Sequence, residues 1–366
     1  MKIAVIAHSL YPIAEPYAGG LEMITELLVR NLLARGHRVD LYAHPDSAPD
    51  LPLIPMLRPA ELHPLLEQDW QQEDERARAE LVQVVTYGRV MDQIARRDYD
   101  IVHNHSLHHI PIARGNARGK TFVTSLHTPA FLHLRAGLAS LASQRQTFTA
   151  VSARQAELWG ELTPAARVIP NGIDVAAWKP GYQPEDYLFW MGRLCPEKAP
   201  HHAIEACRRA GRPIRLAGPV ANEEYFEAHV RPLLDDPLVT YLGHLPHRRI
   251  KPLLARAHAY LFTSTWEEPY GLVLAEALAC ATPVVGYRIG AAPEIVTPEV
   301  GRLVAPQDVA ALAAAIPAVG GIDRRACRAR AERECSARRM TDRYEQLYRS
   351  LLPNSAEHVS DRLLRA

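Results

Sequence analysis

Residues 2–7 read KIAVIA, residues 37–43 read HRVDLYA, and between them Leu21, Ile24 and Leu28 recur at helical spacing. Apolar, β-branched runs that alternate with an amphipathic helix predict βαβ units, and therefore a parallel sheet. Further strands are expected in this first part of the chain at residues 99–105, 121–127, 148–152 and 167–170.

A chain of 366 residues is long enough for two domains, and its pattern restarts once. Residues 170–184 read PNGIDVAAWKPGYQP, a composition typical of a connection between compact units. After it, strands are expected at residues 187–192, 213–218, 239–243, 259–264, 282–287 and 301–306. We predict an α/β protein of two Rossmann-like, doubly wound domains that face a cleft. Their expected bounds are 1–178 and 179–344, with a helix at about 345–366 packing back on the first domain.

The composition is that of an ordinary globular protein, because 42 basic residues nearly cancel 41 acidic ones. This balance argues against a nucleic-acid partner. Five cysteines without a Cys-x-x-Cys motif favour neither disulfides nor zinc, and we expect a cytoplasmic protein. The basic stretch at 323–339 is typical of a solvated helix face, and contact with anionic lipid or an anionic acceptor is the alternative. Peripheral membrane contact is therefore left open.

Residues 266–277, WEEPYGLVLAEA, follow an expected strand, and a helix is expected to begin near Gly271. The backbone N–H groups of Tyr270, Gly271 and Leu272 would then be free at the positive end of a helix. Such an end attracts phosphate.

Two carboxylates, Glu268 and Glu276, accompany that helix. These carboxylates would repel a phosphate beside them, unless they bind a neutral group that is attached to the phosphate, such as sugar hydroxyls. The alternative is a buried or capping Glu276 and a solvated Glu268.

The segment at 192–198, GRLCPEK, again follows an expected strand. Arg193 and Lys198 lie five residues apart on it, and two such cations can straddle a diphosphate. The alternative is that they are surface cations paired with Glu197.

The chain resembles the retaining glycosyltransferases of family 4, which have the GT-B fold. GRLCPEK at 192–198 and EEPYGLVLAEA at 267–277 carry most of the resemblance. Seven further segments match in the family's order: PYAGGLE (16–22), DIVHNHS (100–106), SLHTP (125–129), AVS (150–152), IPNGID (169–174), YLGHL (241–245) and GAAPEIV (290–296).

The resemblance implies a nucleoside-diphosphate-sugar site in the second domain. Arg193 and Lys198 match the family's diphosphate-binding pair, and both are expected to act in catalysis together with Glu268 and His127. Glu276 matches the ribose-binding carboxylate, and Glu268 the carboxylate near the transferred sugar. The region that holds the nucleobase corresponds to Gly243, His244 and Leu245.

In the first domain, the resemblance implies that Gly19 and Gly20 lie in a loop near the donor phosphate or the acceptor. His127 matches a histidine beside the sugar and the reacting centre. Asn171 matches a linker position close to the cleft. We also expect His105 to contact the acceptor, because it follows a strand on the same face as His103.

Two departures from the family pattern stand out. The family more often has glycine where Ala199 and Ala291 stand. Both changes could narrow the donor pocket.

The implied reaction is retaining transfer of a sugar from a UDP-, GDP- or ADP-linked donor to a hydroxyl, by front-face attack. The acceptor would be a sugar, a lipid-linked or a small molecule, and the protein a monomer or homodimer. No metal or cofactor is expected. Asp98 and Asp100 precede a strand at the wrong edge of the sheet for a ligand, and the clustered histidines have no Cys or carboxylate at ligand spacing.

Three alternatives stay open. An epimerase or a phosphorylase could use the same fold, and a non-catalytic nucleotide-sugar binder could retain the site. A dinucleotide oxidoreductase is disfavoured, because no Gly-x-Gly-x-x-Gly follows residues 2–7.

Overall fold

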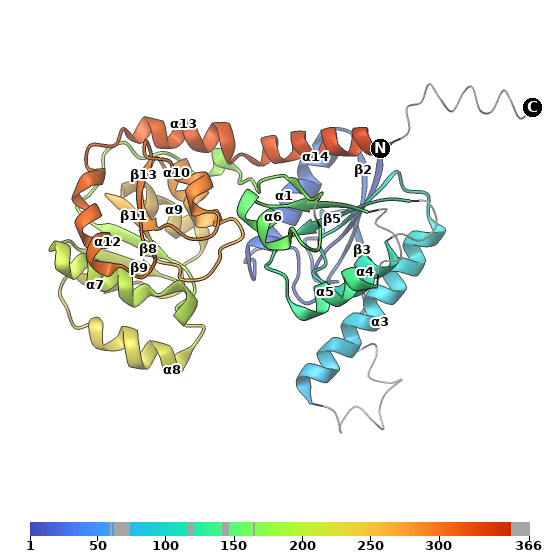
Figure 1. The fold of residues 1–366 in the computed structure, drawn as a ribbon, viewed down its shortest axis with the longest axis horizontal. Helices are drawn as coiled ribbons and strands as arrows, with labels where there is room; N and C mark the ends of the chain where they lie inside the picture. The colour runs from blue at the N-terminus through green and yellow to red at the C-terminus, as the bar shows by residue number, and fades with distance from the viewer. Residues whose placement is uncertain (59–60, 62–73, 116–119, 141–145, 164, 353–366) are drawn as a thin grey trace, which may run out of the picture. The chain divides into compact units, whose positions relative to one another are not determined.

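The computed structural model describes residues 1–58, 61, 74–115, 120–140, 146–163 and 165–352 (Figure 1). The chain forms two compact units, which we describe separately. Unit 1 contains Met1–Val151, Ala156–Ile169 and the chain from Met340 onward, and unit 2 contains Ser152–Gln155 and Pro170–Arg339. The divisions therefore fall at 169/170 and 339/340, where the sequence suggested 178/179 and 344/345.

Unit 1 contains a seven-stranded sheet in the order β3-β2-β1-β4-β5-β6-β7, and its pairings are parallel. The strands are β1 (Lys2–Ile6), β2 (Arg38–Ala43), β3 (Leu53–Pro55), β4 (Ile101–Asn104), β5 (Thr121–Leu126), β6 (Thr147–Ala150) and β7 (Arg167–Val168). Six lie where the sequence predicts strands. The sequence does not predict β3, a three-residue edge strand that ends in a proline, which an edge tolerates.

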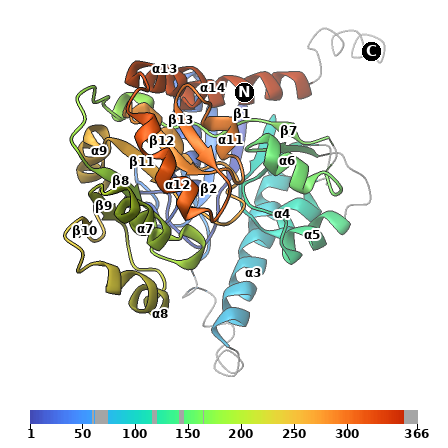
Figure 2. The same ribbon diagram turned by 60° about the vertical axis from the view of Figure 1, so that its left-hand side comes forward.

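The helices of unit 1 are α1 (Gly20–Ala34), α3 (Glu75–Arg96), α4 (His109–Arg114), α5 (Leu132–Ala139) and α6 (Ala153–Trp159), with α14 (Ala337–Leu351) from the other end of the chain. The first three residues of α6 and of α14 belong to unit 2. Both views show α4 beside α5 (Figures 1 and 2). In α14, Met340, Tyr344, Leu347 and Tyr348 are buried at helical spacing. This helix begins eight residues before the predicted start, and the predicted part from 353 to 366 lies outside the described residues.

Unit 2 contains a six-stranded parallel sheet in the order β10-β9-β8-β11-β12-β13. Its strands are β8 (Leu188–Met191), β9 (Ile214–Ala217), β10 (Val239–Tyr241), β11 (Ala259–Phe262), β12 (Val284–Tyr287) and β13 (Gly301–Val304). Its α-helices are α7 (Pro200–Ala210), α8 (Glu223–Tyr225), α9 (His247–Arg256), α10 (Leu272–Ala279), α11 (Ala292–Ile295), α12 (Val309–Ala315) and α13 (Arg324–Glu334). All six strands agree with the sequence prediction.

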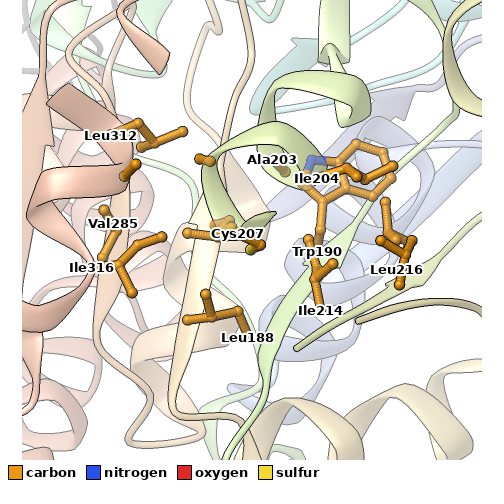
Figure 3. Packing of buried hydrophobic residues seen from close by; sticks show 14 of the residues in the cluster. Leu188, Trp190, Ala203, Ile204, Cys207, Ile214, Leu216, Val285, Leu312 and Ile316 are labelled. Carbon is orange, nitrogen blue, oxygen red and sulfur yellow. The ribbon is translucent and has the colours of Figure 1, made fainter. Parts of the chain in front are cut away.

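The core of unit 2 forms where α7 and α12 cover one face of the sheet (Figures 1 and 2). Alternate residues of two central strands, Leu188 with Trp190 and Ile214 with Leu216, point toward this layer (Figure 3). Cys207 on α7 packs among them. This burial fixes the strands whose carboxyl ends carry the predicted site residues.

The basic stretch at 323–339 is only partly a solvated helix face. Arg324 is 9% exposed and donates to the carbonyls of Gly181, Ala255 and Ala257. Arg328 donates to three more carbonyls, at Val175, Trp178 and Ala279. These two cations therefore hold chain segments of unit 2 together. No helix within the described ranges is both long and apolar enough to cross a bilayer.

Candidate functional site

Unit 2 gathers most of the predicted donor residues beyond the carboxyl ends of its strands. The segment with Arg193 and Lys198 follows β8, and the segment with Glu268 follows β11, the direct neighbour of β8. Because the two strands are parallel, both segments leave the sheet at the same edge, which is where ligands bind in such folds.

Hydrogen bonds from the core fix the position of the Lys198 segment. The Trp190 indole donates to Thr263 Oγ1 at 3.0 Å, and the Thr263 hydroxyl donates to the Lys198 carbonyl at 2.9 Å. The Thr265 N–H donates to the carbonyl of Glu197 at 2.8 Å. A buried tryptophan therefore positions the backbone at Lys198.

The ammonium of Lys198 forms an ion pair with Glu268 Oε1, and the two side chains are 22% and 10% exposed. Ser264 donates to the same oxygen at 3.1 Å. Lys198 Nζ also lies 5.5 Å from the centre of the Trp266 ring, a cation–π contact. Lys198 and Glu268, which the sequence assigned to the same nucleotide-sugar donor, thus contact each other directly.

Arg193 lies apart from this pair. Its side chain is 57% exposed and pairs with Glu197 at 3.3 Å. This is the alternative that the sequence left open for Arg193, whereas Lys198 has Glu268 as its partner.

Glu276 is the fifth residue of α10 and is 5% exposed. Burial raises the pKa of its carboxyl to about 7, and the nearby charge of Lys251 lowers it in part. Burial also raises the pKa of Tyr260, with further increases from the charges of Glu276 and Glu268. The two carboxylates therefore lie near one phenol, whose hydroxyl donates to the Met191 carbonyl at 3.1 Å.

The helix α10 begins near Gly271, where the sequence predicts it. Gly271 is the N-cap residue with φ +88°, and Leu272 is the first helical residue. The N–H groups of Gly271 and Leu272 thus belong to the unpaired helix start, but Tyr270 precedes it. The Tyr270 side chain is buried and hydrogen bonds to Cys335.

Glycines end three neighbouring strands of unit 2. Gly192 follows β8, Gly218 follows β9 and Gly243 follows β10, each with positive φ. A Cβ atom at Gly218 would lie 1.7 Å from the Gly192 oxygen, so no larger residue fits there. The Gly218 N–H donates to the Gly243 carbonyl at 2.9 Å. Of the other two predicted base-contacting residues, His244 is exposed and Leu245 is buried.

Asn171 lies outside helices and strands, whereas Gly19 and Gly20 lie at the start of α1. Asn171 is 8% exposed, and its Oδ1 has no hydrogen-bond partner among the described residues. In unit 1, Gly19 is the extended N-cap residue of α1 and Gly20 is its first residue.

In unit 1, His127 and His105 lie together at the carboxyl ends of β5 and β4. His127 Nε2 lies 2.8 Å from His105 Nδ1, and His105 Nε2 lies 3.2 Å from His103 Nδ1. His105 is fully buried, and its two ring nitrogens contact His127 and His103. Contact between His105 and the acceptor stays a prediction.

Three side chains in unit 1 could bring metal-ligand atoms within 4.8 Å of one another: Glu80, His108 and His109. Glu80 comes from α3, which sequence spacing could not reveal. However, His108 Nδ1 accepts the Ile110 N–H at 3.2 Å as the cap of α4. Neutral His108 then carries its proton on Nε2, which faces the Glu80 carboxylate at 3.5 Å and has no lone pair for a cation. The helix cap competes with metal binding.

Sequence reasoning missed the residues that position the site. Thr263, Ser264 and Trp266 flank Glu268 in the segment already singled out, and a polar run directly after a strand was the available signal. For Gly218, the sequence indicates only the end of a strand. Nothing in the sequence pattern pointed to Trp190, which acts from the core.

Comparisons with known proteins agree with this architecture. Residues 18–177 match the family model described as Glycosyltransferase Family 4, and residues 178–324 match the model described as Glycosyl transferases group 1. The chain is 27% identical to AviGT4, a glycosyltransferase involved in avilamycin A biosynthesis. The two structures superpose with a TM-score of 0.74, covering 97% of this chain and 99% of that one.

Two curated relatives are also glycosyl-transferring enzymes by name. A 174-residue stretch is 36% identical to glycogen synthase of Mycobacterium tuberculosis and covers 44% of this chain and 42% of that protein. The chain thus matches less than half the length of that relative. It is 26% identical over 377 residues to D-inositol 3-phosphate glycosyltransferase of Acidothermus cellulolyticus, covering 86% and 82%. The two family matches together span residues 18–324, so the chain belongs to glycosyltransferase family 4 and has the GT-B fold.

Proposed function

We propose that the protein is a retaining glycosyltransferase that moves a sugar from a nucleoside-diphosphate donor to an acceptor hydroxyl. The observation that carries the proposal is the ion pair of Lys198 and Glu268 at the ends of β8 and β11, with buried Glu276 nearby. A cation beside two carboxylates suits a ligand with an anionic part and a hydroxyl-rich part.

Each of these groups then has its own partner on the donor. Lys198 has three N–H donors, so it can bind a phosphate oxygen and still contact Glu268. Arg193 is exposed and can turn from Glu197 to the second phosphate. Glu268 Oε1 is engaged by Lys198 and Ser264, so we assign Oε2 to hydroxyls of the transferred sugar, and Glu276 to the ribose.

In the proposed reaction, the bond from the anomeric carbon to the diphosphate oxygen breaks while a bond to the acceptor oxygen forms on the same face. The acceptor proton passes to the departing diphosphate. Lys198, together with Arg193 once it has turned to the phosphate, stabilises the charge that grows on this leaving group. His127 contacts a sugar hydroxyl in this proposal.

Thermal-shift measurements against UDP, GDP, ADP and their sugars test the donor. We expect one nucleotide to raise Tm in a concentration-dependent manner. Release of that diphosphate with an acceptor panel, and the anomeric configuration of the product by NMR, then test transfer and retention. A protein that neither binds nor releases any of the nucleotides contradicts the proposal.

The same assays separate the alternatives. A binder would shift Tm without turnover, an epimerase would convert the donor without an acceptor, and a phosphorylase would show pyridoxal absorbance. We expect a chelator to leave transfer unchanged, and a strict Mg²⁺ requirement would contradict the metal-free reaction. Acceptor identity, the monomer or homodimer state and peripheral membrane contact stay predictions.

A further inference from the structure

A continuous chain of hydrogen bonds in unit 1, buried except at its partly buried His127 end, links α14 to His127. It begins at Tyr348, whose hydroxyl lies 2.6 Å from His103 Nδ1. It continues through His103 and His105, and it ends at His127 Nε2. Tyr348, His103 and His105 are all 0% exposed, so water does not compete for these contacts.

The other side of His103 is also fixed. Its Nε2 lies 2.7 Å from Ser125 Oγ, which lies 2.8 Å from Thr149 Oγ1 and 2.9 Å from the Tyr344 hydroxyl. A hydroxyl accepts two hydrogen bonds and donates one, so Ser125 can accept from His103 and satisfy both neighbours. Every polar atom around the His103 ring then has a partner.

The single hydroxyl proton of Tyr348 determines the direction of the hydrogen bonds that lead from Tyr348 to His127. Burial raises the pKa of this phenol well above its usual value, so the proton stays on the oxygen. Within the described part of the chain, only His103 Nδ1 hydrogen bonds to this hydroxyl. Tyr348 must therefore donate, because the opposite direction would leave a buried O–H without an acceptor.

The tautomers of the three histidines follow in order. Burial lowers the pKa values of His103 and His105 well below the usual range and that of His127 to about 4, so all three rings are neutral near pH 7. Because His103 Nδ1 accepts from Tyr348, the proton of His103 sits on Nε2. A lone pair on His105 Nε2, 3.2 Å away, would then face the lone pair of His103 Nδ1, so His105 carries its proton on Nε2 and shares this acceptor with Tyr348. His105 Nδ1 is left to accept from His127 Nε2.

We propose that Tyr348 is a positioning residue that holds His127, through His103 and His105, in the tautomer protonated on Nε2. His127 Nδ1 is then a fixed hydrogen-bond acceptor, which can receive a hydrogen bond from a sugar hydroxyl. This role at the sugar rests on the proposed function, whereas the tautomer itself does not. No described residue hydrogen bonds to His127 Nδ1, so that lone pair is available.

Long-range ¹H–¹⁵N correlation spectra of the full chain labelled with ¹⁵N-histidine measure the tautomer without any substrate. The His127 signals are assigned by their loss in His127→Gln. We expect the wild-type ring to show an unprotonated Nδ1 and a protonated Nε2. A proton on Nδ1 of wild-type His127 overturns the proposal, and this outcome needs no variant to fold.

Two variants on one helix test whether Tyr348 sets the tautomer. Tyr348→Phe removes the hydroxyl donor, so the hydrogen bonds between the three histidines can run in either direction. The ¹⁵N chemical shift of His127 Nδ1 should therefore move toward the value of a protonated nitrogen. Tyr344→Phe is the matched control, because its ring lies 4.7 Å from the His103 ring but its hydroxyl contacts Ser125 and Thr149. We expect that control to keep the wild-type tautomer. A Tyr348→Phe protein with the wild-type tautomer overturns the role of Tyr348.

Activity gives an independent readout. We expect kcat for sugar transfer to fall about fivefold in Tyr348→Phe, the effect of one net hydrogen bond, and to change less in Tyr344→Phe. If His127 shows the expected tautomer but no nucleoside diphosphate is released, the proposed function is wrong and the tautomer proposal still holds. If the protein transfers sugar but His127 is protonated on Nδ1, the tautomer proposal is wrong and the proposed function still holds.

Discussion

The ammonium of Lys198 and the carboxylate of Glu268 form an ion pair in unit 2, although 70 residues separate them in the chain. Two neighbouring parallel strands bring them together. Removing either group leaves a partly buried charge without its partner, which costs more than the loss of a surface pair.

We predict that Lys198→Ala weakens binding of the nucleoside diphosphate about tenfold or more, because a charge-assisted hydrogen bond to phosphate is lost. Calorimetric titration with the nucleotide found by thermal shift measures this change. Arg209→Ala is the control, since Arg209 is also paired with a glutamate in unit 2 but is 48% exposed on α7. Full donor affinity in Lys198→Ala would count against the proposed diphosphate site.

Glu276 makes stability depend on pH in a defined direction. Its pKa rises from 4.5 to about 7 on folding, so between these values the folded state binds more protons than the unfolded state. The contribution of Glu276 to the free energy of unfolding is therefore fully present below pH 4.5 and is lost as pH rises through about 7. The loss corresponds to about 3 kcal/mol for a shift of this size.

Glu276→Gln removes this dependence while keeping the shape of the side chain. We expect the variant to be more stable relative to wild type at pH 8 than at pH 5, as measured by calorimetric unfolding at both values. A difference in stability that is the same at the two pH values would show that Glu276 is ionised throughout.

Gly218→Ala should destabilise unit 2 by ~3 kcal/mol or more, because a Cβ there would lie 1.7 Å from a carbonyl oxygen in addition to the unfavourable φ of +152°. Gly211→Ala is the matched control. Gly211 has φ +63°, and a methyl group added there would have nothing within 4 Å, so only the backbone cost of about 1 kcal/mol applies. Equal losses in Tm for the two variants would contradict the close contact between the β8 and β9 segments.

Ala199 occupies a left-handed conformation, with φ +44° and ψ 55°, between Lys198 and α7. This conformation explains why glycine suits the position. Relief of about 1 to 2 kcal/mol of backbone strain outweighs the added flexibility of the unfolded chain, so Ala199→Gly should raise stability by up to ~1 kcal/mol. A small increase in Tm checks this prediction, and a decrease would show that the buried methyl group contributes more through packing.

Much of the fold could be predicted from the sequence, because most strands are short apolar runs bounded by glycine, proline or polar residues. Ile3 to Ile6 and Leu188 to Met191 are such runs, buried throughout. The sequence did not predict β3, because three residues among prolines are too few to show the alternating pattern of a strand. The sequence placed the division between the units at 178/179 from composition, whereas contacts divide them at 169/170, because contacts decide to which unit each residue belongs.

The sequence proposed site residues one by one but could not predict which of them contact each other. Sequence motifs indicated Lys198 and Glu268 separately, yet their contact depends on β8 and β11 being neighbours. Strand order follows from packing of the whole sheet, which periodicity along the chain does not contain. The contact of Tyr348 could not be predicted for the same reason, because the sequence of α14 does not indicate which strand the Tyr348 hydroxyl contacts.

The return of α14 to unit 1 has a consequence for synthesis on the ribosome. The nascent chain presents β4 and β5 early, but Tyr344 and Tyr348 emerge only after all of unit 2 has been translated. Until then the imidazole of His103 lacks the phenol that satisfies it. The later unit can thus complete its sheet first, whereas the earlier unit lacks α14 until that helix has been translated.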